Sequence, residues 1–476
     1  MAFFIIYLSF TIRFSFDFSS FFSIIRENLY FIILSMITNL KKVWATEHIR
    51  KKILFTLGMV AVYKLLSTLP VPGVNVTLLD AFTTQLRANT QLAFFGSIMG
   101  GGLEQFSIIL MGLAPYINAT IIIQLLTVII PSMEALKKEG EQGQKKLNNY
   151  TRYLTVPLAL AQSYGMIYLL NNIIGTQSGG GGASIIDTTN FMGVILPAML
   201  SITAGTMILL WLGDLITESG IGNGTSIIIF AGVLAGVPQH IMNYVNVGNF
   251  GLLFVLALLT VGVIYVIVKF TEGYRKVPLI YTRTGRDERS YFPIRVNQAG
   301  MVPIIFAVSL ITFPALIGQI LQRRGTGKSA EIGDWLVTNL SMQNPSWIYI
   351  IVYALLVLGF AFFYVSITFN TTEVAESIQK RGGYIPGVRP GKETATFLQK
   401  VSDRLNLFGG GFLALIAVFP YIATKVVPLL GFTSIGTSNI DFLISGSGLI
   451  IVVGVILDII RRIDTDMKSF DYKKFY

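Results

Sequence analysis

The sequence predicts an all-α polytopic membrane protein with ten transmembrane helices. Of its 476 residues, 53% are hydrophobic and only 13% are charged, and the mean hydropathy is +0.66. A water-soluble domain carries a charged fraction of about 25%, so lipid rather than water is the expected solvent. Uncharged apolar runs recur along the chain, and a helix of about twenty residues crosses a hydrocarbon core of about 30 Å.

Ten apolar runs are candidates for these helices. Strands are not expected, because every backbone polar group in lipid has to be paired within its own segment. The fifth run is short and can continue through Val245. The runs are Ile53–Leu69, Phe106–Ile130, Leu154–Ile174, Phe191–Leu212, Ser226–Val237, Gly251–Val268, Val302–Leu321, Trp347–Phe369, Phe408–Val427 and Phe442–Leu457.

The distribution of lysine and arginine predicts the orientation. If the segment before the first run is cytoplasmic, the loops on that side carry 28 Lys and Arg residues, counted from Lys41, and the opposite loops carry five. This asymmetry predicts that both termini are cytoplasmic and that the number of spans is even. The net charge of +11 therefore needs no nucleic-acid partner. The cell inner (plasma) membrane is the expected location, and a plastid or other organellar membrane stays an open alternative.

The chain is expected to consist of an N-terminal extension and two halves. Residues 1–35 lack the basic start of a signal peptide, and Met36 is an alternative translation start. Residues 36–245 form the N-terminal half with spans one to five. Residues 246–476 form the C-terminal half with spans six to ten and cytoplasmic loops at 269–297 and 370–407. Each half opens with a span and a long connection, which is compatible with pseudo-symmetric inverted repeats.

Residues that commonly catalyse reactions or bind metals are scarce, so we expect that the protein is not an enzyme and has no cofactor and no metal site. The chain has no cysteine, and its two histidines, His48 and His240, lie far apart. The stretch Gly325–Ser329 resembles a phosphate-binding loop, but Gln322 stands where that motif needs glycine. Spans two to nine carry no carboxylate, which argues against an ion-coupled transporter of a small solute, the alternative function.

Two segments are unusual enough to indicate a function. Residues 95–105 are rich in glycine and too short to span, so they are either a flexible external loop or a weakly held, movable half-helix. In the second run, Leu113, Ile117, Thr120 and Gln124 follow helical spacing and share one face. The amides of Asn118 and Gln124 cost free energy at membrane depth unless they meet water or a partner. Such a face either joins helices or lines a pore.

Five long motifs in order resemble the SecY/Sec61-alpha family of protein translocase channels, over nearly the whole chain from Lys41 to Asp464. The resemblance departs at residues 1–35, at a shortened loop around Arg283–Tyr291, and at the glycine run 179–182. The motifs are Gly112–Thr127, Lys137–Lys146 with Tyr150–Tyr153, Trp211–Phe230, Val296–Gly300 and Tyr384–Gly391.

The resemblance implies a role for particular residues. Two five-helix halves would form an hourglass that opens sideways between spans two and seven. The implied pore ring is Leu113, Ile117, Ile229, Ile305 and Ile451. The implied lateral gate contains Asn118, Gln124 and Asn297, and the implied plug contains Phe95, Gly96, Ser97, Ile98, Met99, Gly100, Gly101 and Gly102. Arg389, Arg283, Arg286 and Arg289 would contact a cytosolic partner.

The resemblance also implies the partners. They are unfolded secretory and membrane polypeptides, small single-span SecE-like and SecG-like subunits, a SecA-like motor ATPase, the ribosome and the lipid bilayer. An uncharged constriction agrees with this function, because a channel that passes many different polypeptides should not bind one sequence better than another. Apolar walls also resist the passage of water and ions by dewetting.

Overall fold

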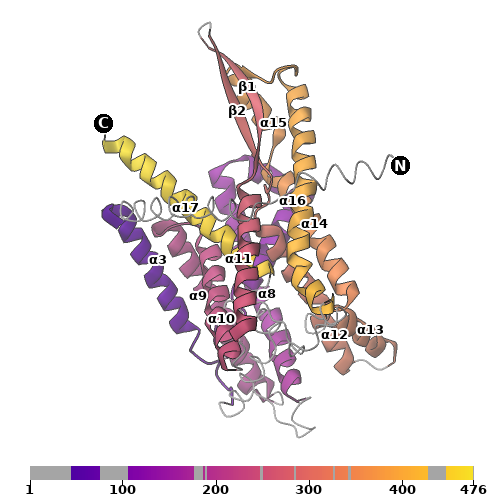
Figure 1. The fold of residues 1–476 in the computed structure, drawn as a ribbon. Helices are drawn as coiled ribbons and strands as arrows, with labels where there is room; N and C mark the ends of the chain where they lie inside the picture. The colour runs from indigo at the N-terminus through magenta and orange to yellow at the C-terminus, as the bar shows by residue number, and fades with distance from the viewer. Residues whose placement is uncertain are drawn as a thin grey trace.

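The computed structural model describes residues 44–75, 106–175, 186–187, 190–246, 250–283, 286–324, 327–340, 345–426 and 446–474 (Figure 1). Its longer helices run roughly side by side. The helices are α3 (Glu47–Leu66), α6 (Ala114–Ile129), α7 (Pro131–Lys138), α8 (Glu141–Gly175), α9 (Leu196–Ser219, extended at its start by the π-helix Phe191–Ile195), α10 (Gly224–Asn246), α11 (Phe250–Glu272), α12 (Val302–Arg324), α13 (Lys328–Leu340), α14 (Trp347–Thr368), α15 (Thr371–Lys380), α16 (Lys392–Val426) and α17 (Gly446–Lys474). The strands are β1 (Tyr274–Arg283), β2 (Arg286–Arg295) and β3 (Gly383–Tyr384).

Each of the ten predicted spans overlaps a helix. Four helical stretches are long and apolar enough to cross a membrane when taken alone: Phe191–Ser219, Phe254–Glu272, Trp347–Lys380 and Lys392–Ala423. The pair α6 and α7 passes the same test as a bent unit, with an angle of 101° between its two helices. The protein is therefore a mostly helical membrane protein.

The second predicted span begins later than expected. The sequence suggested a helix from Phe106, whereas α6 begins at Ala114 and residues 106–113 form turns. Gly112 has a φ of +53°, which a right-handed helix cannot contain. Pro115, in the first turn of α6, has a φ compatible with starting a helix there. The apolar run was continuous, so hydropathy alone could not locate this boundary.

The sequence predicted only helices, so an irregular loop was expected at 269–297. In the structure this loop instead forms a long β-hairpin. β1 pairs antiparallel with β2 from Tyr274↔Arg295 to Arg283↔Arg286, and β3 adds to the other side of β1. Val277 and Leu279 lie two apart on one face and are buried with Ile294, as strand periodicity requires. The hairpin packs against residues of α15 and α16. The hairpin therefore has an apolar core of its own, outside the helical body.

Several helices continue beyond their apolar runs. α8 begins at Glu141, α16 at Lys392, and α17 ends at Lys474. Charged residues four apart stabilise such polar turns, as between Lys145 and Glu141. Hydropathy finds only the lipid-crossing part of a helix, so the sequence predicted these helices too short.

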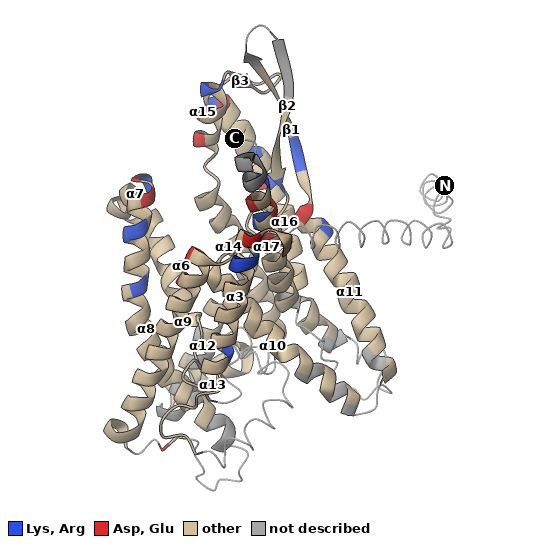
Figure 2. Cartoon of the chain, turned by 90° about the vertical axis from the view of Figure 1, so that its left-hand side faces the viewer, with Lys and Arg blue, Asp and Glu red and all other residues tan. Residues whose placement is uncertain are grey.

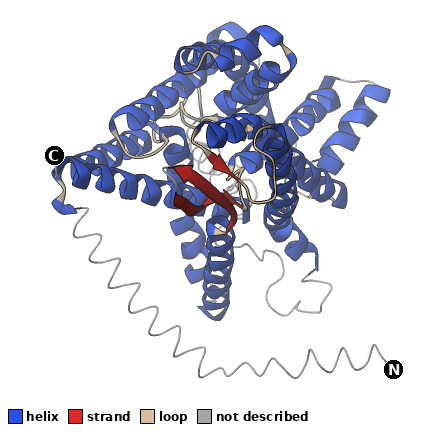
Figure 3. Cartoon of the chain, turned by 90° about the horizontal axis from the view of Figure 1, so that it is seen from above, coloured by secondary structure: helices blue, strands red, loops and turns tan. Residues whose placement is uncertain are grey.

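Charged residues gather at one end of the molecule, which we call the basic end (Figure 2). It contains α7, the hairpin β1–β2, α15 and the last turns of α17. Lys52 near the start of α3 bonds Asp466 of α17 at 2.7 Å, so the first described helix begins at the same end. Seen from above, the strands lie over the middle of the helical body (Figure 3). The loops that the distribution of lysine and arginine placed on one side of the membrane therefore lie together.

Three larger apolar clusters organise the described part of the helical body, beside a small one around Ala361 and Val365 of α14. One contains residues of α11, α12, α14, α16 and α17. Another joins α8 and α9 to residues 106–111. The third draws on α3, α6, α9 and α10 and also on α12 and α17. We call this third cluster the central cluster, because it alone of the three mixes helices from before and after residue 246.

Candidate channel constriction and gate

The five residues of the implied pore ring meet in the central cluster. They come from four different helices: Leu113 is the N-cap of α6 and Ile117 lies within it, while Ile229, Ile305 and Ile451 belong to α10, α12 and α17. All five side chains are buried, with exposed fractions between 1% and 8%, and all five belong to the central cluster. Residues separated by more than 300 positions along the chain therefore converge at one place.

Local backbone features hold the first two of these residues in position. Gly205 of α9 lies so close to the backbone of Ile108 that no side chain would fit there. This contact fixes the turns that precede α6. The turn at Gly112 and the proline start of α6 then direct Leu113 and Ile117 into the cluster one turn apart.

The buried members of the central cluster are aliphatic and aromatic side chains. Branched aliphatic side chains give a constriction that repels water without binding any particular side chain. Such a set of side chains can therefore form a seal. In the part of the chain that the structure describes, no group of three or more His, Cys, Asp or Glu could hold a metal ion.

α6 packs directly against α12, a contact that we call the seam, and the residues of the implied gate lie on α6 and just before α12. Asn118 is buried in α6. Gln124 lies further along the same helix, and its buried Oε1 has no hydrogen-bond partner within the described ranges. Asn297 is buried before α12, and its Oδ1 accepts a hydrogen bond of 2.9 Å from the backbone N–H of Gly300. An orphaned amide at this depth is costly unless water or another chain reaches it.

A contact at the basic end joins α7, which follows α6, to α14, which packs against α12, and no sequence pattern predicted it. Lys137 of α7 donates a hydrogen bond of 2.9 Å to the carbonyl of Ile367 in the last turn of α14. The C-terminal carbonyls of a helix carry partial negative charge and attract cations. Partial burial lowers the pKa of Lys137, and Glu373 and Glu134 oppose that shift. From the sequence, Lys137 was only one of many basic loop residues.

The implied partner-binding residues also lie at the basic end. Arg389 lies in a turn between Gly387 and Gly391, which have φ values of +79° and +97°, and its side chain is exposed. The Arg389 carbonyl accepts a hydrogen bond of 2.9 Å from Thr394 Oγ1, which ties the turn to the start of α16. Arg283, Arg286 and Arg289 lie on the strands of the hairpin, with Arg283 paired opposite Arg286.

Two predicted segments lie outside the described residues. They are the N-terminal extension 1–35 and the glycine-rich segment 95–105 with the implied plug.

Among the described residues, four helices and one bent helix pair are long and apolar enough to cross a membrane, which defines the class of protein as a multi-pass membrane protein. The family model named SecY matches residues 107–460. A relative called protein translocase subunit SecY, from Corynebacterium glutamicum, is 38% identical over 439 residues, which are 89% of this chain and 96% of the relative. The chain therefore belongs to the SecY family of protein translocase subunits.

Solved structures have the same fold. One, described as showing that the plug domain of SecY stabilises the closed state of the translocation channel, gives a TM-score of 0.60 at 18% identity and covers 88% of this chain and 93% of its own. Another, Sec61 in the canine ribosome–channel complex, gives a TM-score of 0.56 at 15% identity with the same coverage. As a member of the SecY family, the protein is a protein-conducting channel subunit and not an enzyme.

Proposed function

We propose that unfolded polypeptides cross the membrane through the central cluster, with Leu113, Ile117, Ile229, Ile305 and Ile451 as the ring that seals it. One observation carries the proposal: these five buried aliphatic residues come from helices of both halves, 36–245 and 246–476, and meet in one apolar cluster. With the ring packed as it is, the path is closed. A passing chain has to separate the two groups of helices.

The aliphatic side chains of the ring suit a channel for unfolded polypeptides for physical reasons. Packed together, they exclude water, so ions cannot cross in a closed channel. Around a moving chain, they contact any side chain by dispersion alone, which does not select sequence. The glycine-rich plug, residues 95–102, would add a second barrier, because glycine disfavours a stable helix and allows such a segment to move away.

Apolar segments would leave the channel sideways between α6 and α12. Asn118, Gln124 and Asn297 would line this seam, and polar groups there lower the free energy of hydrating it once the helices part. A nascent segment that is itself apolar then gains by partitioning into lipid. Lys137 would act as a latch at the basic end, since its bond to α14 must break when the seam opens.

Moving a polypeptide through the ring needs work, which a partner would supply. We place the protein in a bacterial plasma membrane. Its basic end and both termini lie on the cytoplasmic side, as the distribution of lysine and arginine predicts. The exposed Arg389 and the arginines of the hairpin would bind a SecA-like motor or the ribosome there, since a basic surface attracts acidic partners and nucleic acid. SecE-like and SecG-like single-span subunits would complete the assembly.

Reconstitution tests this proposal. The protein is purified in mild detergent, copurifying single-span subunits are identified, and the complex is placed in vesicles with a motor ATPase and a secretory precursor. Protease-protected precursor inside the vesicles is the expected result. Absence of single-span subunits, together with uptake of a small solute and none of the precursor, would overturn the proposal.

A further inference from the structure

A polar joint connects α16 to the segment that leads into α12. Ser402 of α16 is fully buried, and its Oγ donates a hydrogen bond of 3.0 Å to Oε1 of Gln298. Gly409 lies two turns further along the same face of α16, and a side-chain carbon there would lie 2.5 Å from the carbonyl oxygen of Val296. The segment before α12 is therefore held by α16 at two points.

The segment from Gln298 to α12 has a fixed shape. Asn297 Oδ1 accepts a hydrogen bond of 2.9 Å from the backbone N–H of Gly300. Gly300 has a φ of +64°, a conformation that favours glycine. α12 begins directly afterwards at Val302, and Ile305 of the proposed ring lies in its first turn. A displacement of Gln298 therefore moves the start of α12, and Ile305 moves with it.

On its other side, the joint adjoins the turn that contains Arg389. Thr394, in the first turn of α16, donates a hydrogen bond of 2.9 Å to the carbonyl of Arg389. Leu398 and Val401 of α16 are buried in one apolar core with residues of the β-hairpin. The turn, the hairpin and the first turns of α16 are therefore one packed unit, and Ser402 follows this unit directly in the chain.

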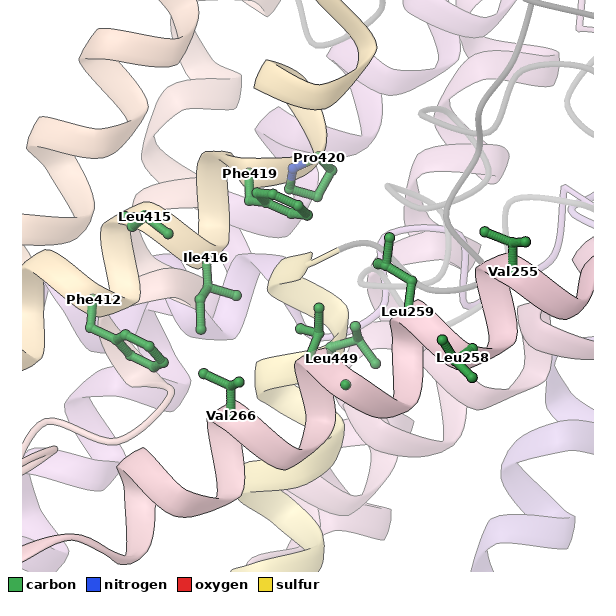
Figure 4. A pocket seen from close by; sticks show the side chains of 12 residues that line it. Val255, Leu258, Leu259, Val266, Phe412, Leu415, Ile416, Phe419, Pro420 and Leu449 are labelled. Atoms are coloured by element: carbon green, nitrogen blue, oxygen red, sulfur yellow. The ribbon is translucent and has the colours of Figure 1, made fainter. Parts of the chain in front are cut away.

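Two features allow the joint to change. A groove with apolar walls lies between α11 and α16, and Phe412 and Ile416 point toward it from α16 while Val266 does so from α11 (Figure 4). Because closely packed neighbours resist displacement, α16 can shift more easily toward this open side. In addition, the buried Nε2 of Gln298 finds no hydrogen-bond partner among the residues that the structure describes. A second arrangement that pairs this amide would therefore recover free energy.

We propose that Gln298 and Ser402 are positioning residues, whose hydrogen bond transmits a displacement of α16 to the start of α12. A partner bound at the turn of Arg389 shifts α16 through the packed unit. The joint then draws the segment before α12 along and separates α12 from α6. This inference rests on the proposed function, since it takes Arg389 as a docking residue and the seam as the gate.

Distances between spin labels across the seam test this inference. The chain has no cysteine, so Ile122→Cys in α6 and Leu310→Cys in α12, both at exposed positions, give a reference channel with one label on each side. The full-length protein, with any subunits that copurify, is placed in nanodiscs. Pulsed electron paramagnetic resonance is recorded before and after a SecA-like motor and a non-hydrolysable ATP analogue are added. We expect the motor to increase the population with the longer distance.

Two variants in this background remove the joint. Gln298→Met and Ser402→Ala should each reduce the motor-induced open-to-closed ratio by about 2- to 10-fold, because each removes one hydrogen bond. Motor affinity and the distance before the motor is added should stay unchanged. Thr396→Ala is the matched control, since its hydroxyl bonds only the carbonyl of Lys392 in the same helix, and it should respond fully.

The outcomes separate the inference from the proposed function. A full motor response in Gln298→Met and Ser402→Ala, with a reference channel that responds, would overturn the inference and leave the proposed gate standing. A longer distance before the motor is added would also overturn it, because the joint would then hold the closed structure and not transmit a displacement. No response of the reference channel to a bound motor would refute the proposed gate and the inference together.

Discussion

Replacing Ile117 with serine should make the resting channel leak ions. Ile117 is 8% exposed in the central cluster, and burial of an isoleucine side chain stabilises by about 1.5–3 kcal/mol. If these contacts exist only while the ring is closed, losing them shifts the closed-to-open ratio by about 10- to 100-fold. Ile117→Asp should leak more, because a carboxylate among these apolar side chains draws in water.

The matched control is Ile122→Ser, five residues along the same helix. Ile122 is 36% exposed and lies outside the central cluster, so the same substitution should leave the seal intact. Conductance of the purified channel in a planar bilayer, without precursor, measures the difference. Equal and negligible conductance for Ile117→Asp and Ile122→Ser would show that the pore does not pass Ile117.

Three further predictions concern the ends of the molecule. Arg389→Glu should impair export at an unchanged membrane level, because it replaces attraction by repulsion at an exposed turn; normal motor binding and export would refute it. Lys137→Met removes the hydrogen bond to Ile367, weakens the closed state by about 0.5–1.5 kcal/mol, and should increase export of a precursor with a defective signal sequence; unchanged export would count against the latch. A gene that starts at Met36 should complement a depleted strain, and failure at equal protein level would show that residues 1–35 are needed.

The sequence was sufficient to predict the helices that cross the lipid, because burial in lipid demands long apolar runs. It was insufficient where structure depends on packing or on polar turns. The start of α6 depends on the backbone at Gly112, and the helical continuation of α8 back to Glu141 is polar. The β-hairpin was missed because its buried residues, such as Val277 and Leu279, lie inside a segment dominated by its basic character.

Predicting the residues of the candidate site needed information other than hydropathy. Periodicity placed Leu113 and Ile117 on one face of α6, but no pattern links them to Ile451, which lies more than 300 residues away. Only the family motifs could bring these residues together before the structure was known. The bond from Lys137 to Ile367 had no sequence signal, because its acceptor is a backbone carbonyl.

Site-specific photocrosslinking of a stalled precursor tests most directly whether the polypeptide passes through the ring. A photoreactive amino acid replaces Ile451, which is 1% exposed in the central cluster, and in a second variant it replaces Leu355 of α14, which is 61% exposed outside it. A precursor arrested midway should crosslink at position 451 and not at position 355. Crosslinking at 355 without any at 451 would contradict the proposed path through the central cluster.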